Sequence, residues 1–170
     1  MNPNQLTYTK EQAESFLKLN RRPNQIYMKR FDAEVVFRRG KIDDTQIDKV
    51  RYKEDSRPER IFNKTLGRDI DKKSDIITYK PNGKNELYVL ARSGGISLFD
   101  GISSKVKLGQ KDCWWVITKN AKVEDGLIIA KDVFKDAEGN THYSIEADRD
   151  MPVSEYLEKV GKLKQYMKRF

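Results

Sequence analysis

Two strand-like segments about 45 residues apart constrain the fold of this chain most. The first, Gly94–Phe99, opens with two glycines and continues as an alternation of apolar and polar residues, and the second is Thr141–Glu146. Because side chains alternate between the two faces of a strand, the second segment is expected to place three polar side chains on one face. These are His142, Ser144 and Glu146. Neither segment alone indicates a particular fold or function, so the two must be interpreted together with the rest of the chain.

Further strands are expected before and between these two segments. Residues 25–39 alternate in the manner of one strand that includes Arg38. Residues 114–117 and 127–134 are rich in aromatic and β-branched side chains and predict buried strands. A glycine-containing stretch at residues 138–140 predicts a hairpin turn into the second segment.

Helices are expected at both ends of the chain and in its middle. Thr9 and Gln12 form the capping-box pattern at the start of a helix over residues 10–20. Apolar residues at helical spacing predict an amphipathic helix over residues 153–168. Two polar stretches predict short surface helices, at residues 44–54 and 59–66. Strands and helices together predict the α+β class.

The length of 170 residues fits one main domain. We expect this domain at residues 25–170, after an N-terminal helix and linker at residues 1–24. The single cysteine, Cys113, excludes an intrachain disulfide and a Cys-rich zinc site, so no metal is expected. No run approaches the roughly 20 apolar residues of a membrane span, so no membrane partner is expected.

The charge of the chain favours anionic partners. The net charge is +8, and residues 1–80 hold 19 Lys and Arg against 13 Asp and Glu, whereas residues 81–170 hold 15 against 13. A positive potential of this kind attracts the pyrophosphate of NAD, nucleic acid or an acidic protein. The first half of the chain is therefore the expected place for such contacts.

Taken in order, the motifs of the chain resemble small cytotoxic effectors related to the type VI secretion exported toxin two, whose fold is ADP-ribosyltransferase-like. The matching motifs are Leu87-Tyr88, Gly94-Gly95, Ser97, Phe99-Asp100, Trp115-Val116-Ile117, Gly126-Leu127-Ile128, Asp132 and Thr141-His142-Tyr143 with Ile145, followed by Met151 and a C-terminal helix. The resemblance covers roughly residues 25–165. The hydrophobic-aromatic-Arg signature that opens such domains is matched by Val36-Phe37-Arg38, and Tyr27-Met28-Lys29-Arg30 competes with it. Either Arg38 or Arg30 is therefore the family arginine.

The resemblance implies split mixed and antiparallel β-sheets that form an NAD cleft, with flanking helices. It also implies an NAD-dependent ADP-ribosyltransferase, which is a glycosyltransferase. The catalytic residues would be Ser97, His142 and Glu146. The residues that bind NAD would be Arg38, Gly94, Gly95, Ser97 and Trp115.

These residue types suit that chemistry. Cleavage of NAD between nicotinamide and ribose develops positive charge on the ribose, so hydrogen-bonding groups must hold the sugar. The planar, permanently charged fork of Arg38 suits a pyrophosphate. The glycines permit positive φ or the close approach of the backbone to a ligand.

The resemblance further implies an antibacterial toxin of interbacterial competition. Such a protein is made in a bacterial cytoplasm, is exported without a signal peptide by a component of the secretion apparatus, and acts in the cytoplasm of the target cell. Its acceptor would be a protein or an RNA. A cognate immunity protein is also expected, and it should be acidic because the toxin is basic.

Two alternatives also fit the charge. The first is a toxin ribonuclease that uses His142 with Lys and Arg residues on bound RNA. Because the chain has one histidine, a paired-histidine mechanism is excluded, and Glu146 or a lysine would be the partner. The second is a non-catalytic module that binds nucleic acid, although the sequence lacks zinc-finger spacing, an RNP-type aromatic signature and a continuous basic helix. Release of nicotinamide from NAD would separate the transferase from both.

Overall fold

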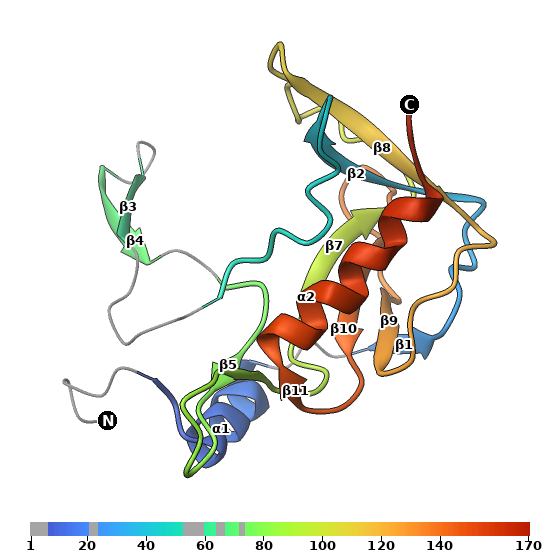
Figure 1. Cartoon of the computed structure of the whole chain (residues 1–170). Coiled ribbons are helices and arrows are strands. Elements are labelled where there is room, and N and C mark those ends of the chain that lie inside the picture. Colours follow the sequence, from blue (N-terminus) through green and yellow to red (C-terminus); the bar gives the residue numbers. More distant parts are fainter. Residues whose placement is uncertain (1–6, 21–23, 53–59, 64–66, 72–73) are drawn as a thin grey trace.

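The computed structural model describes residues 7–20, 24–52, 60–63, 67–71 and 74–170. Within these residues the chain forms a mixed α+β fold in which antiparallel strands dominate (Figure 1). This confirms the α+β class predicted from the sequence. No helix in the described part of the chain is long and apolar enough to cross a membrane.

The largest sheet contains seven antiparallel strands in the order β1-β9-β10-β7-β2-β8-β12. Their bounds are Gln25–Met28 (β1), Val35–Lys41 (β2), Gly95–Phe99 (β7), Asp112–Thr118 (β8), Leu127–Asp132 (β9), His142–Ala147 (β10) and Met167–Arg169 (β12). A small sheet in the order β11-β6-β5 joins Met151–Pro152, Tyr88–Val89 and Thr78–Tyr79. A separate pair is formed by β3 (Arg60–Asn63) and β4 (Arg68–Asp71).

The seven-stranded sheet is split between β2 and β7. These strands are joined at the register pair Phe37↔Phe99, whereas β2 follows β8 from Val35↔Thr118 to Lys41↔Asp112. In Figure 1, β2 and β8 run across the direction of β7 and β10. The backbone of β7 therefore lacks a continuous strand partner on its β2 side.

One face of the sheet is covered by α2 (Val153–Gly161), as Figure 1 shows. Tyr156 on this helix packs in the same apolar core as Tyr143 and Ile145 of β10. Its hydroxyl donates a hydrogen bond to the Ile145 carbonyl oxygen at 2.6 Å, and burial raises the pKa of Tyr156 above its ordinary value. By alternation, the side chain of His142 lies on the face away from α2.

The N-terminal helix is confirmed as α1, Lys10–Asn20. The backbone amide nitrogen of Gln12 donates to Thr9 Oγ1 at 3.2 Å, and the backbone amide nitrogen of Thr9 donates to Gln12 Oε1 at 3.0 Å. These reciprocal bonds are the capping box that the sequence predicts. The division of the chain into residues 1–24 and 25–170 stays a prediction.

The single strand predicted over residues 25–39 is wrong, because the chain bends between β1 and β2. Phe31 is buried at the bend and packs edge-on against Tyr143. Asp32 accepts a hydrogen bond from the Tyr143 hydroxyl at 2.7 Å and pairs with Lys131 at 2.6 Å. These contacts with distant strands stabilise a bend that local alternation does not reveal.

The short helices predicted at 44–54 and 59–66 are also wrong in their described parts. Residues 44–52 form an isolated bridge, a turn and irregular segments, with Gln46 at φ 55°, and residues 60–63 form β3. The remainder of both ranges lies outside the described residues. The C-terminal helix is correct only to Gly161, because a 3₁₀ helix (Lys162–Tyr166) follows and β12 then pairs with β8.

Candidate functional site

Ser97 and His142 meet on neighbouring strands. His142 Nε2 lies 3.0 Å from Ser97 Oγ, although 45 residues separate them in the chain. The register of β7 and β10 explains the contact, because His142 pairs with Phe99 and Ser144 pairs with Ser97. The Phe99 ring lies 5.1 Å from the imidazole, measured between ring centroids. The structure therefore brings together two of the three predicted catalytic residues.

Asp132 extends this pair and was not predicted as a site residue. Its Oδ2 lies 3.0 Å from His142 Nδ1, and its Oδ1 accepts a hydrogen bond from Gln25 Nε2 at 3.0 Å. Asp132 lies one residue beyond the register pair Tyr143↔Lys131. Its place among the motifs of the family resemblance was the signal in the sequence that could have singled it out.

Glu146 lies on the same strand as His142 but is buried. It is 2% exposed, and its Oε2 accepts a hydrogen bond from Ser144 Oγ at 2.6 Å. A ribose would reach this carboxylate only after the groups that cover it move. The assignment of Glu146 as a catalytic residue stays a prediction.

Gly94 and Gly95 are in close contact with the protein's own backbone. Gly94 has a φ of 108°, and a Cβ there would lie 2.3 Å from the Asp75 carbonyl oxygen. A Cβ on Gly95 would lie 1.9 Å from the Ile145 carbonyl oxygen. Both glycines are thus required by intramolecular packing, and their assignment to NAD binding stays a prediction.

Arg38 occupies the split between β2 and β7. Its Nη1 donates to the Ser97 carbonyl oxygen at 3.0 Å, and its Nη2 donates to the carbonyl oxygens of Gln46 at 3.2 Å and Lys49 at 3.4 Å. Burial lowers the pKa of Arg38 below its ordinary value. The guanidinium thus donates to three backbone carbonyl groups, and it contacts the backbone of Ser97 rather than its hydroxyl.

The other two predicted residues lie outside the Ser97 and His142 contact. Trp115 is the register partner of Arg38, and its Nε1 donates to the Lys41 carbonyl oxygen at 2.8 Å. Arg30 is exposed and donates to the Asn120 carbonyl oxygen at 3.2 Å. Of the two candidate arginines, Arg38 is therefore the one that lies beside Ser97. The role of Trp115 in NAD binding stays a prediction.

Changing Arg38 to lysine is expected to lower the free energy of unfolding by about 1–3 kcal/mol, because an ammonium group cannot reproduce the fork that serves three carbonyls. Urea unfolding followed by circular dichroism measures the change. The matched control is Arg39→Lys, since exposed Arg39 makes an ion pair with Asp112 at 2.8 Å and Asp112 keeps its second ion pair, with Lys41, in this variant. Equal stabilities of the two variants would contradict the structural role of Arg38.

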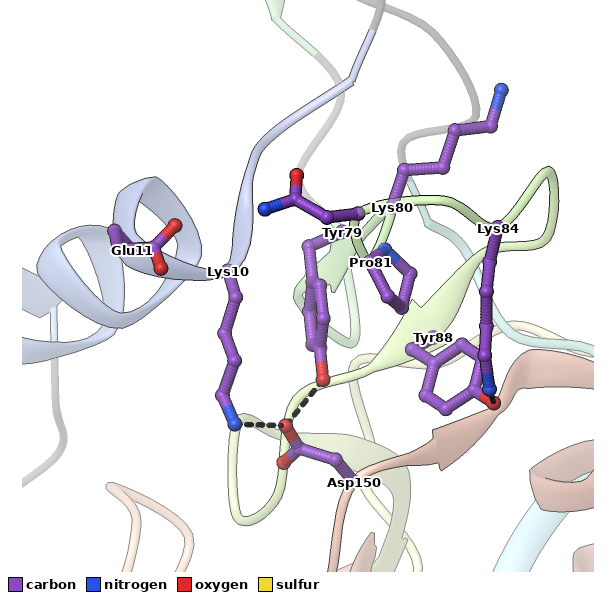
Figure 2. Close-up of a pocket in the computed structure, with 9 residues that line it drawn as sticks. Lys10, Glu11, Tyr79, Lys80, Pro81, Lys84, Tyr88 and Asp150 are labelled. Atoms are coloured by element: carbon purple, nitrogen blue, oxygen red, sulfur yellow. Dashed lines mark hydrogen bonds and ion pairs between the residues drawn. The ribbon is translucent and has the colours of Figure 1, made fainter.

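A pocket elsewhere in the molecule shares no residue with this site (Figure 2). It lies between α1 and the small sheet, and three contacts join polar side chains that line it. The Tyr79 hydroxyl donates to Asp150, Lys10 pairs with Asp150 at 3.6 Å, and Lys84 Nζ donates to the Tyr88 hydroxyl at 2.7 Å. The contacts at Asp150 tie α1 to the body of the fold.

A family model matches most of the chain. The model of the family described as Tse2 ADP-ribosyltransferase toxin matches residues 19–170, a range that includes Arg38, Ser97, Asp132 and His142. A comparison with curated proteins finds no match to the chain.

Proposed function

Since this chain belongs to the Tse2 ADP-ribosyltransferase toxin family, we propose that it cleaves NAD and transfers ADP-ribose to a protein or an RNA. Membership of the family makes the chain a toxin of the ADP-ribosyltransferase type, and thus a transferase. The observation that carries the finer proposal is the 3.0 Å contact between Ser97 Oγ and His142 Nε2. It places a hydroxyl and an imidazole side by side on the sheet face away from α2.

The chemistry of this pair suits a ribose. The bond between nicotinamide and ribose breaks as positive charge develops on the sugar, which the protein can assist by holding the ribose hydroxyls. Ser97 offers a hydroxyl that both donates and accepts, and His142 offers a ring nitrogen beside it. The His142 side chain is 13% exposed, so water screens its electrostatic interactions only in part.

Arg38 supports NAD as the substrate in a second way. Among the described residues, its buried Nε has no hydrogen-bond partner. A guanidinium suits a phosphate oxygen, but this Nε is enclosed by protein, so a phosphate would reach it only after the groups that cover it move. We propose that such a rearrangement lets Arg38 hold the pyrophosphate of NAD, while Ser97, whose hydroxyl is oriented by His142, holds the ribose.

The proposed setting follows from the family and the charge. We place the action of the toxin in the cytoplasm of a target bacterium, after export by a type VI secretion apparatus. A producing cell would need an immunity protein, and the net charge of +8 favours an acidic one. The same charge suits an RNA acceptor.

The direct test is release of nicotinamide. Purified protein mixed with NAD and bacterial extract is expected to release nicotinamide and to leave labelled ADP-ribose on a macromolecule, which nuclease or protease treatment would identify as RNA or protein. Extract without the toxin is the control. Growth arrest with no nicotinamide release, accompanied by RNA degradation without NAD, would replace this proposal with the ribonuclease.

A further inference from the structure

A chain of hydrogen bonds crosses four neighbouring strands of the large sheet. Gln25 on β1 donates to Asp132 on β9 at 3.0 Å. Asp132 meets His142 Nδ1 on β10 at 3.0 Å, and His142 Nε2 meets Ser97 on β7 at 3.0 Å. We propose that Asp132 is a positioning residue that fixes the tautomer and orientation of His142, and thereby the direction of the Ser97 hydroxyl. The proposal rests on the function proposed above.

The register of the strands brings the four side chains of this series of hydrogen bonds together. Gln25 and Asp132 are direct register partners of β1 and β9. His142 follows on β10 beside the pair Tyr143↔Lys131, and its own partner on β7 is Phe99, two residues from Ser97. Because side chains alternate, the four polar groups share one face.

The carboxylate of Asp132 decides which ring nitrogen carries the proton. An ionised carboxylate only accepts hydrogen bonds, so the nitrogen that faces it, Nδ1, must be the donor. In the neutral ring Nε2 is then an acceptor, and the Ser97 hydroxyl must donate to it. The lone pairs of Ser97 Oγ are left to accept hydrogen bonds from a substrate hydroxyl.

Other contacts hold the carboxylate and the ring in place. Gln25 binds the second carboxylate oxygen, so Asp132 is held at both oxygens. The side chain of Asp132 is 25% exposed and that of His142 is 13% exposed, so water screens their interaction only in part. The Phe99 ring packs against the imidazole. Asp132 therefore acts on the substrate through His142.

The chain contains one histidine, so NMR of its ring nitrogens reports on His142 alone. At a pH well above the ordinary His pKa of about 6.5, the parent protein is expected to show the proton on Nδ1. In Asp132→Asn, Gln25 holds the amide oxygen and the amide group donates to Nδ1, so the proton is expected on Nε2. A proton that stays on Nδ1 in this variant would overturn the proposal.

The matched control is Asp32→Asn, which also replaces one carboxylate that contacts a residue of β10. Asp32 contacts Lys131 and Tyr143, whose side chains lie on the opposite face from His142. This variant is expected to keep the proton on Nδ1. Thermal unfolding of both variants would establish that each is folded.

Activity supplies the second readout. Asp132→Asn is expected to slow nicotinamide release by about 100-fold, because the Ser97 hydroxyl is then misdirected relative to the ribose, while Asp32→Asn stays near the parent rate. A changed tautomer with an unchanged rate would overturn the positioning role. If the parent protein releases no nicotinamide, the proposed function fails, and the tautomer still decides whether Asp132 orients His142.

Discussion

Replacing Gly95 with alanine is expected to disrupt the centre of the seven-stranded sheet. An added Cβ would lie 1.9 Å from the Ile145 carbonyl oxygen, 2.6 Å from its carbonyl carbon and 2.9 Å from the Tyr156 hydroxyl. The first two atoms belong to the backbone of β10 and cannot move without breaking its pairing with β7. We expect the free energy of unfolding to fall by about 4 kcal/mol or more, a large part of the usual 5–15 kcal/mol. Urea unfolding measures it.

Gly161→Ala is the matched control for this change. Gly161 ends α2, and a Cβ there would lie 3.8 Å from Asp48 Oδ2, which is ordinary van der Waals contact. Because alanine favours the helix by up to about 1 kcal/mol over glycine, this variant is expected to be as stable as the parent or slightly more so. A Gly95→Ala protein with the parent's unfolding midpoint would show that the β7 and β10 register is wrong.

Removing either Ser97 Oγ or the His142 ring is expected to abolish growth arrest. Ser97→Ala and His142→Ala should each lower the rate of nicotinamide release by about 100-fold or more, because each variant loses the 3.0 Å contact that orients both groups. The double variant should be little worse than either single variant, since residues that act as a unit are not additive. Nicotinamide release and growth after induction are the measurements.

The control for Ser97→Ala is Ser154→Ala. Ser154 lies at the exposed start of α2, and its hydroxyl donates to Glu86 at 3.3 Å. This variant is expected to arrest growth as the parent does. Folded Ser97→Ala and His142→Ala proteins that remain fully toxic would refute the site.

Local signals in the sequence predict local structure well in this protein. The capping box at Thr9 and Gln12 predicts the start of α1 because both bonds lie within one turn. The turn at residues 138–140 is found where composition places it, with Gly139 at φ 79°. Where distant contacts compete with local preference, prediction fails: residues 44–52 follow the carbonyl contacts of Arg38 instead of forming a helix.

The family and the α+β class can be predicted from the order of the amino acids, because they depend on ordered motifs and local patterns. The same holds for the alternation that puts His142, Ser144 and Glu146 on one face of β10. The contact of Asp132 with His142 and the position of Arg38 beside Ser97 become visible only in the folded chain. These contacts span 10 and 59 residues of chain, and they depend on strand register. A shift of one residue would turn each side chain to the opposite face, and no local pattern in this sequence fixes that register.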